Sequence, residues 1–177
     1  LLGRHQVENA AVAAMAALLV VERDKRLTPE HIKAGLAGTV WPGRFEVVSG
    51  NPPVIIDGAH NPAGVARLRE TLDEYFPGRA ITFLLGILRD KDVQTMVDIL
   101  IRPADTVVVA APDSNRAGDP AAVAGRIKNG RRVETAPSIA AGVERVWELA
   151  GPAGLVCIAG SLYLVGGARR LLGKVDK

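Results

Sequence analysis

The sequence has little of what marks several large classes of protein. Its 177 residues include a single cysteine, Cys157, so a disulfide framework within the chain is excluded. The longest apolar stretch, 10–21, is shorter than the roughly 20 residues of a membrane-spanning helix, and no cationic lead marks it as a secretory signal. The formal net charge is only +3, and the basic residues are scattered. We therefore expect a cytoplasmic protein with neither a membrane nor nucleic acid as a partner.

Two common phosphate-binding motifs are missing as well. The only Gly-Lys pair, Gly173-Lys174, lacks the upstream glycine and the hydroxyl residue of a phosphate loop. No G-x-G-x-x-G pattern occurs, so the dinucleotide-binding fingerprint is absent. Aromatic residues are scarce, at 4%, whereas 48% of the chain is hydrophobic. This balance is typical of Ala-rich helices layered on a sheet of β-branched strands.

Apolar runs alternate with helical patterns over most of the chain. The runs predict strands at 45–48, 54–56, 81–85, 106–110, 132–135 and 155–159. Helical periodicity predicts helices at 63–76, 93–101, 120–128, 139–149 and 162–172. Only five residues separate the first two strands, which favours a hairpin, and the longer connections favour parallel crossovers. The fold class is therefore α/β: a Rossmann-like, doubly wound, mostly parallel six-stranded sheet with an N-terminal hairpin.

A short helical segment precedes this sheet. The Ala-rich stretch 5–21 predicts one helix, and Thr28-Pro29 predicts the start of a second, because Thr is a good N-cap and Pro fits the first helical position. Trp41-Pro42-Gly43-Arg44 then has Pro and Gly where a type II turn uses them. We expect a helical part over 1–40 and an α/β domain over 41–177.

The stretch that points most directly to chemistry follows the second strand. Asp57-Gly58-Ala59-His60-Asn61-Pro62 comes directly after the apolar residues 54–56. Asn61 can cap the next helix, with Pro62 in its first position. Asp57 and His60 are therefore expected in the crevice at the carboxyl ends of the strands, where open α/β sheets bind ligands. From the residues alone, Asp57 can equally cap the loop through backbone N–H groups, and His60 can equally be structural.

Several motifs together carry a resemblance to one family. They are His5-Gln6-x-x-Asn9, Trp41-Pro42-Gly43-Arg44-Phe45-Glu46, Asp57-Gly58-Ala59-His60-Asn61-Pro62, Asp90-Lys91-Asp92 and Gly160-Ser161-Leu162-Tyr163-Leu164-Val165-Gly166. In order and spacing the chain resembles the bifunctional folylpolyglutamate synthases/dihydrofolate synthases of the Mur ligase superfamily. The resemblance covers essentially the whole chain but only the C-terminal part of the family's protein. Residues 1–40 then correspond to the helical tail of a central ATPase domain, and 41–177 to the C-terminal glutamate ligase domain.

The resemblance implies an ATP-dependent ligase. ATP would activate a carboxylate of dihydropteroate or of a folate as an acyl phosphate, which the amine of L-glutamate then attacks. The phosphate loop and the Mg²⁺ ligands are expected on the missing N-terminal ATPase domain, so the family places no metal site on this chain. The chain is expected to be inactive alone, and the whole enzyme is expected to be a monomer.

Three residues resemble the family's nucleotide contacts. Asn9 can form paired hydrogen bonds with the adenine edge. Without the resemblance, the simpler interpretation is that Asn9 is an ordinary polar residue in the first turn of a helix. Arg44 follows a rigid turn, and its planar fork of donors suits phosphate oxygens. Asp57 corresponds to the family's carboxylate for the nucleotide, where it would accept hydrogen bonds from the ribose hydroxyls.

The other implied contacts concern L-glutamate. His60 corresponds to a residue near the incoming amino acid, where it would bind the carboxylate or guide the amine as a catalytic group. Ser161 begins the last helix, and its hydroxyl lies with the N–H groups that suit a carboxylate; an ordinary N-cap uses the same helix end. Lys91, between Asp90 and Asp92, fits either an anion contact or a solvated charged turn.

Two other functions remain open at this point. Other amino-acid-adding Mur-type ligases share the Asp-x-x-His-Asn-Pro pattern, although Trp-Pro-Gly-Arg and Gly-Ser-Leu-Tyr-Leu favour the folate branch. From a different class, the chain could be a non-catalytic module that binds a nucleotide or an amino acid, since it has no phosphate loop.

Overall fold

The computed structural model describes residues 1–23, 26–48, 50–130 and 132–173, and the chain divides into two compact units, 1–42 and 43–177. The first unit consists of α1 (Arg4–Arg23) packed against α2 (Pro29–Ala37). Thr28 caps α2 as expected: its hydroxyl accepts a hydrogen bond from the His31 N–H at 3.4 Å. The assignment of this unit to the end of an ATPase domain stays a prediction.

The second unit is built on one six-stranded sheet. Its strands are β1 (Glu46–Val48), β2 (Val54–Ile56), β3 (Thr82–Leu85), β4 (Thr106–Ala110), β5 (Arg132–Ala136) and β6 (Val156–Ala159). Their order across the sheet is β1-β2-β6-β3-β4-β5. The β1–β2 pair is antiparallel and every other neighbouring pair is parallel, which confirms the predicted mostly parallel sheet and its hairpin.

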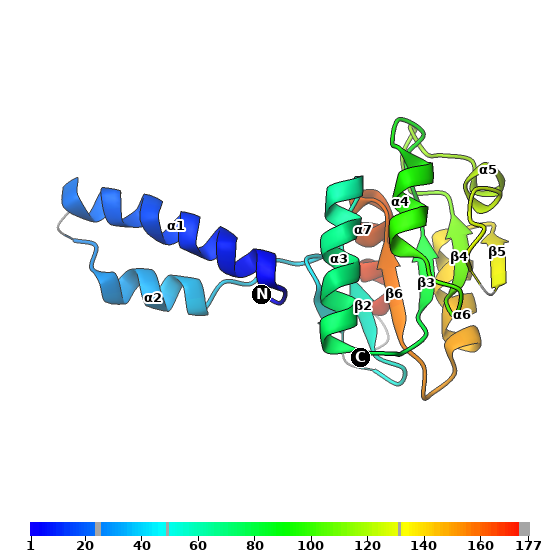
Figure 1. The fold of residues 1–177 in the computed structure, drawn as a ribbon, viewed down its shortest axis with the longest axis horizontal. Coiled ribbons are helices and arrows are strands. Elements are labelled where there is room, and N and C mark those ends of the chain that lie inside the picture. Colours follow the sequence, from blue (N-terminus) through cyan, green and yellow to red (C-terminus); the bar gives the residue numbers. More distant parts are fainter. Residues whose placement is uncertain (24–25, 49, 131, 174–177) are drawn as a thin grey trace. The chain divides into compact units, whose positions relative to one another are not determined.

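Helices cover both faces of this sheet. They are α3 (Pro62–Tyr75), α4 (Val93–Leu100), α5 (Pro120–Ala124), α6 (Ile139–Ala150) and α7 (Leu162–Leu172). Figure 1 shows α3 and α4 in front of the sheet and α6 and α7 behind it. This is the doubly wound arrangement that the alternating pattern predicts.

The strands alternate buried side chains between the two faces. Val54, Ile56, Val156 and Ile158 pack in one cluster with residues of α6 and α7, such as Leu164. Ile55 and Cys157 lie between them in sequence and therefore point to the opposite face, toward α3 and α4. Cys157 is fully buried, as expected, and burial raises the pKa of its thiol.

The predicted helix starts are confirmed by their caps. The side chains of Asn61, Asp119, Ser138 and Ser161 each accept a hydrogen bond from a backbone N–H in the first turn of the following helix. The predicted helix ends lie within two residues of the observed ones except at α5, which ends at Ala124 rather than at 128. Beyond it the chain forms tighter turns, in which the Ile127 N–H donates to the Ala124 carbonyl, because Gly125 favours an early end.

A buried charge network lies at the amino ends of β3 and β4. The Arg69 guanidinium of α3 contacts Asp105 at 3.2 Å and Asp73 at 2.6 Å. Asp105 also accepts hydrogen bonds from the backbone N–H groups of Ile81 (2.9 Å) and Arg102 (3.0 Å). These contacts satisfy the buried carboxylate of Asp105, so the network ties α3 to the starts of two central strands.

Candidate active site

The candidate site lies where β2, β6 and β3 end. The register pairs Ile56 with Ile158 and Leu85 with Ala159, so the three strands end at the same level. After β2 the chain continues into α3 on one face, and after β6 it continues into α7 on the other (Figure 1). This is the topological switch point at which open α/β sheets form a ligand-binding crevice.

Backbone hydrogen bonds join the loops at this edge of the sheet. The Gly160 N–H donates to the Ala59 carbonyl at 3.0 Å, which links the β6–α7 loop to the β2–α3 loop. The Gly58 N–H donates to the Gly43 carbonyl at 2.7 Å, which links the β2–α3 loop to the turn before β1. Three motifs that are far apart in the sequence therefore meet at one edge of the sheet.

Glycine is required at Gly160 for this close approach. Gly160 has φ 107°, and a Cβ there would lie 2.9 Å from the Gly86 carbonyl oxygen. A larger residue at this position would strain the backbone and push the β6–α7 loop away from the end of β3.

Asp57 organises the loop through its carboxylate. One oxygen accepts a hydrogen bond from the Ala59 N–H and the other from the Phe45 N–H, both at 2.8 Å. Asp57 therefore caps its own loop, which is one of the two roles that the sequence allows. Its carboxylate also holds the turn that carries Arg44, through the Phe45 N–H. Because each carboxylate oxygen can accept more than one hydrogen bond, this role leaves a nucleotide contact possible.

The turn that carries Arg44 has a defined backbone. Gly43 has φ 72°, as a type II turn requires at its third residue, and the Arg44 side chain is exposed. Phe45 has φ 41°, a left-handed conformation that is uncommon outside glycine. Its buried ring packs against Tyr75, with 6.0 Å between the ring centroids, and this packing with the Asp57 hydrogen bond maintains the conformation. The sequence motif pointed to Arg44, but no pattern in it indicated the backbone of Phe45.

Glu46, which the sequence reasoning did not single out, holds the same turn from its other side. Its carboxylate accepts a hydrogen bond from the Gly43 N–H at 2.7 Å. The Arg169 Nε of α7 donates to both carboxylate oxygens, at 3.0 and 3.1 Å. The turn is thus tied to the helix that starts at Ser161.

His60 has a defined tautomer in its neutral form. Its Nδ1 lies 2.8 Å from the Gly58 carbonyl oxygen. A carbonyl oxygen only accepts hydrogen bonds, so Nδ1 must carry the hydrogen and donate it. In the neutral ring, Nε2 is then left without a hydrogen, and it can accept one from an ammonium or amine group.

Ser161 begins α7 as the sequence predicts. Its Oγ accepts a hydrogen bond from the Leu164 N–H at 3.1 Å, and the residue is only 1% exposed. The hydroxyl can still donate its own hydrogen, and the first turn of α7 adds backbone N–H groups at the crevice. A carboxylate at this helix end is therefore an electrostatically favourable ligand.

Asn9 lies in the other unit and is described apart from these residues. It is exposed on α1, where its Nδ2 donates to the Gln6 Oε1 at 3.2 Å. Arg44, Asp57, His60 and Ser161 all belong to the second unit. Four of the five predicted site residues therefore lie in neighbouring loops of the second unit, and the fifth, Asn9, lies in the first unit.

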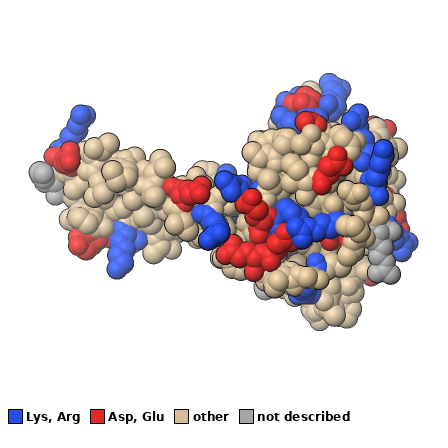
Figure 2. All heavy atoms as spheres, viewed as in Figure 1, with Lys and Arg blue, Asp and Glu red and all other residues tan. Residues whose placement is uncertain are grey.

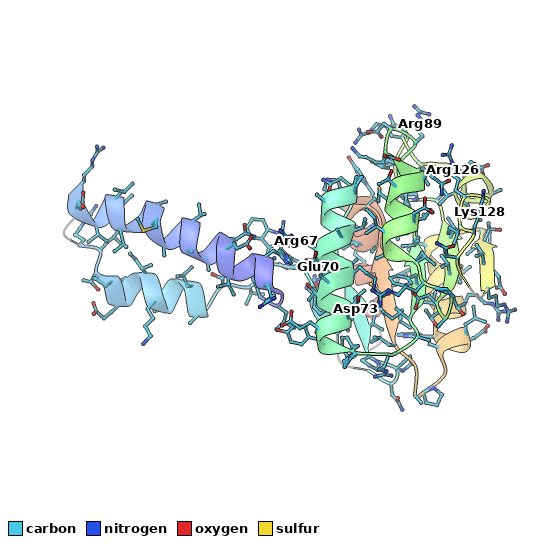
Figure 3. The ribbon with its side chains drawn as sticks, viewed as in Figure 1. Arg67, Glu70, Asp73, Arg89, Arg126 and Lys128 are labelled. Atoms are coloured by element: carbon cyan, nitrogen blue, oxygen red, sulfur yellow. The ribbon has the colours of Figure 1, made fainter. Side chains whose placement is uncertain are left out.

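The charged residues after β3 form a solvated turn. Lys91 pairs with Asp90 at 3.1 Å, and a hydrogen bond from Lys91 lowers the pKa of that carboxyl group. Figure 2 shows Lys and Arg mixed with Asp and Glu on the surface of the second unit, and Figure 3 shows Arg89, Arg126 and Lys128 on its outer side. Such mixing is usual for a solvated surface, and an anion contact by Lys91 stays a prediction.

The described residues contain neither a cluster of metal-ligating side chains nor a helix of membrane-spanning length. Within residues 1–23, 26–48, 50–130 and 132–173, no three His, Cys, Asp or Glu residues are grouped so that they could hold a metal ion. No helix in the same ranges is long and apolar enough to span a membrane.

The chain matches one protein family over most of the second unit, and it matches individual relatives over nearly its whole length. Residues 43–162 match the family described as Mur ligase, glutamate ligase domain. The folylpolyglutamate synthase of Lacticaseibacillus casei is 36% identical over 178 residues, which cover 97% of this chain and 39% of the relative. The dihydrofolate synthase/folylpolyglutamate synthase of Bacillus subtilis is 34% identical over 175 residues, covering 97% and 40%. The chain thus spans about two fifths of the length of these relatives.

Solved structures resemble the chain over nearly its whole length. A Mycobacterium tuberculosis folylpolyglutamate synthase complexed with ADP matches with a TM-score of 0.85 and 34% identity, covering 98% of this chain and 41% of that one. E. coli FolC in complex with DHPP and ADP matches with a TM-score of 0.83 and 25% identity, covering 96% and 39%. A Yersinia pestis bifunctional enzyme complexed with AMPPNP and a Mn ion matches with 0.74 and 25%, covering 83% and 35%.

Proposed function

Because the chain belongs to the Mur ligase glutamate ligase domain family, we propose that it is part of an ATP-dependent ligase that adds L-glutamate to dihydropteroate or to a folate. The names of its relatives support the substrate class, and the ADP complexes of similar structures support the use of ATP. The observation that carries the proposal is that the Arg44 turn, the Asp57–Asn61 loop and the start of α7 are joined by hydrogen bonds at one edge of the sheet. Its action as a cytoplasmic monomer stays a prediction.

The second unit supplies groups for both substrates of such a reaction. Arg44 offers a planar fork of donors for phosphate oxygens, and Asp57 offers acceptors for ribose hydroxyls. The first turn of α7 and the Ser161 hydroxyl offer donors for a carboxylate of L-glutamate. Asn9 belongs to the first unit, on α1, and its carboxamide is proposed separately as a contact for the adenine edge. The phosphate loop and the Mg²⁺ ligands are proposed to lie outside this chain.

His60 is proposed to act on the attacking amine. In the ligation, the glutamate nitrogen forms a bond to the activated carbonyl carbon, and the bond from that carbon to the phosphate oxygen breaks. The nitrogen must also lose a proton. The Nε2 of neutral His60 can accept this proton, since Nδ1 is held as a donor by the Gly58 carbonyl. Protonated, the same ring can hold the glutamate carboxylate.

We expect the chain to need an ATPase partner for turnover, because its sequence has no phosphate loop. A hybrid ligase, in which this chain replaces the matching part of the Bacillus subtilis relative, should release ADP only when L-glutamate and a folate are present. The 177-residue chain alone should neither hydrolyse ATP nor extend a folate. Turnover by the chain alone would contradict this prediction. An inactive hybrid, with nucleotide binding by the chain, would favour the non-catalytic module.

His60→Ala in the hybrid ligase should raise the KM for L-glutamate by about tenfold or more, because it removes a group that binds or deprotonates the amino acid. The KM for ATP should change little. His60→Gln is the matched control: its amide can hydrogen-bond to glutamate but cannot take up a proton. A normal KM with a reduced kcat in His60→Gln would support proton transfer. An unchanged dependence on glutamate in His60→Ala would indicate a structural histidine.

A further inference from the structure

We propose that Glu46 is a positioning residue for Arg44: it holds the turn from which the Arg44 guanidinium reaches the nucleotide. This inference rests on the proposed function, in which Arg44 contacts a phosphate. It concerns residues of the second unit alone. Its basis is the set of contacts that the Glu46 carboxylate makes on both sides of the turn.

The first contact lies within the turn itself. The Gly43 N–H donates a hydrogen bond to the Glu46 carboxylate at 2.7 Å. This bond links the residue before Arg44 to a residue that follows it, so it restrains the backbone on both sides of Arg44. Gly43 has φ 72° and Phe45 has φ 41°, so residues with left-handed backbone lie on both sides of Arg44. An uncommon conformation of this kind persists only where surrounding contacts maintain it.

The second contact ties the turn to α7. The Arg169 Nε donates to both oxygens of Glu46, at 3.0 and 3.1 Å, a geometry in which one donor is shared by both acceptors. Arg169 lies in the last turn of the helix that Ser161 begins. Arg169 therefore holds Glu46 in place from α7, the helix whose first turn is proposed to bind L-glutamate. Glu46 in turn holds the turn that carries Arg44, the proposed phosphate contact.

The third contact acts on the other side of the same turn. The Phe45 N–H donates to Asp57 at 2.8 Å, and the Gly58 N–H donates to the Gly43 carbonyl at 2.7 Å. Asp57 and Glu46 thus hold the turn from opposite sides, one through the residue after Arg44 and the other through the residue before it. An arginine side chain has many rotamers, so a fixed backbone reduces the entropy lost when its guanidinium binds.

A double-mutant cycle between Glu46 and Arg44 tests the proposal in the hybrid ligase. Glu46→Ala should raise the KM for ATP by about tenfold and leave the KM for L-glutamate nearly unchanged. Because Glu46 acts through Arg44, Glu46→Ala should add no further loss in the Arg44→Ala background. Glu46→Gln should recover part of the loss, since its amide oxygen can still accept the Gly43 N–H.

A matched control removes a similar pair elsewhere in the same unit. Glu134 pairs with Arg145 at 2.8 Å, and its side chain is 26% exposed, against 24% for Glu46. Glu134→Ala should leave both KM values unchanged. If it raises the KM for ATP as much as Glu46→Ala does, general loss of stability explains the effect and the proposal is overturned.

The 177-residue chain provides a second measurement that needs no activity. The NMR order parameter of the Arg44 backbone N–H should be near that of rigid backbone, about 0.85, and should fall in Glu46→Ala but not in Glu134→Ala. An unchanged order parameter, or additive effects in the cycle, would overturn the positioning role. If the unmodified hybrid releases no ADP, the proposed function fails, and the order parameter alone decides the role of Glu46.

Discussion

Arg69→Ala is expected to lower the free energy of unfolding of the second unit by about 3–5 kcal/mol, the usual cost of leaving one partner of a buried ion pair alone. Arg69 and Asp105 have side chains that are only 6% and 2% exposed, and they contact each other at 3.2 Å. Without the guanidinium, the Asp105 carboxylate keeps its backbone N–H donors but loses its contact with the Arg69 cation. Urea unfolding followed by circular dichroism measures the change.

Arg67, two residues before Arg69 on α3, gives the control for this prediction. Arg67 pairs with Glu70 at 3.0 Å, but both side chains are at least half exposed. Figure 3 shows Arg67, Glu70 and Asp73 following one another along α3. Exposed pairs contribute little to stability, so Arg67→Ala should shift the urea midpoint only slightly. Equal losses in the two variants would contradict the structural role of the buried network.

Asp57→Ala is expected to have the largest effect on the reaction. In the hybrid ligase it should raise the KM for ATP by about a hundredfold, or about 2.8 kcal/mol, which is the size of one hydrogen bond to a charged group. The Phe45 N–H loses its acceptor, so the Arg44 turn is released, and any contact of Asp57 with the nucleotide is lost as well. The loss of thermal stability should be the smaller effect.

Two measurements separate the roles of Asp57. Differential scanning calorimetry gives the stability of Asp57→Ala, and steady-state kinetics give its KM for ATP. A collapse in thermal stability with an unchanged KM would mean that the carboxylate only caps its loop. Asp57→Asn is the conservative control, because its single amide oxygen can replace one of the two acceptors and should give an intermediate loss.

The strands and helices follow from local patterns, which explains why they could be predicted closely. Val54–Ile56 is a continuous apolar run, and such runs form strands that are buried on both faces. Asn61-Pro62 starts a helix for purely local reasons, since the Asn oxygen accepts a nearby N–H and Pro has none to satisfy. The end of α5 was predicted less well, because Gly125 and the tighter turns after it compete with a short helix of low burial.

The types of chemical group at the candidate site follow from the amino-acid sequence alone. Arg44, Asp57, His60 and Ser161 lie in motifs whose residue types suit phosphate, ribose, an amine and a carboxylate, and these motifs indicate the family. How these groups are held depends on contacts between distant parts of the chain. Phe45 and Asp57 are twelve residues apart, and Glu46 and Arg169 are separated by 123. Hydrogen bonds at such separations depend on the sheet order that brings β1, β2 and β6 together, and no local pattern encodes them.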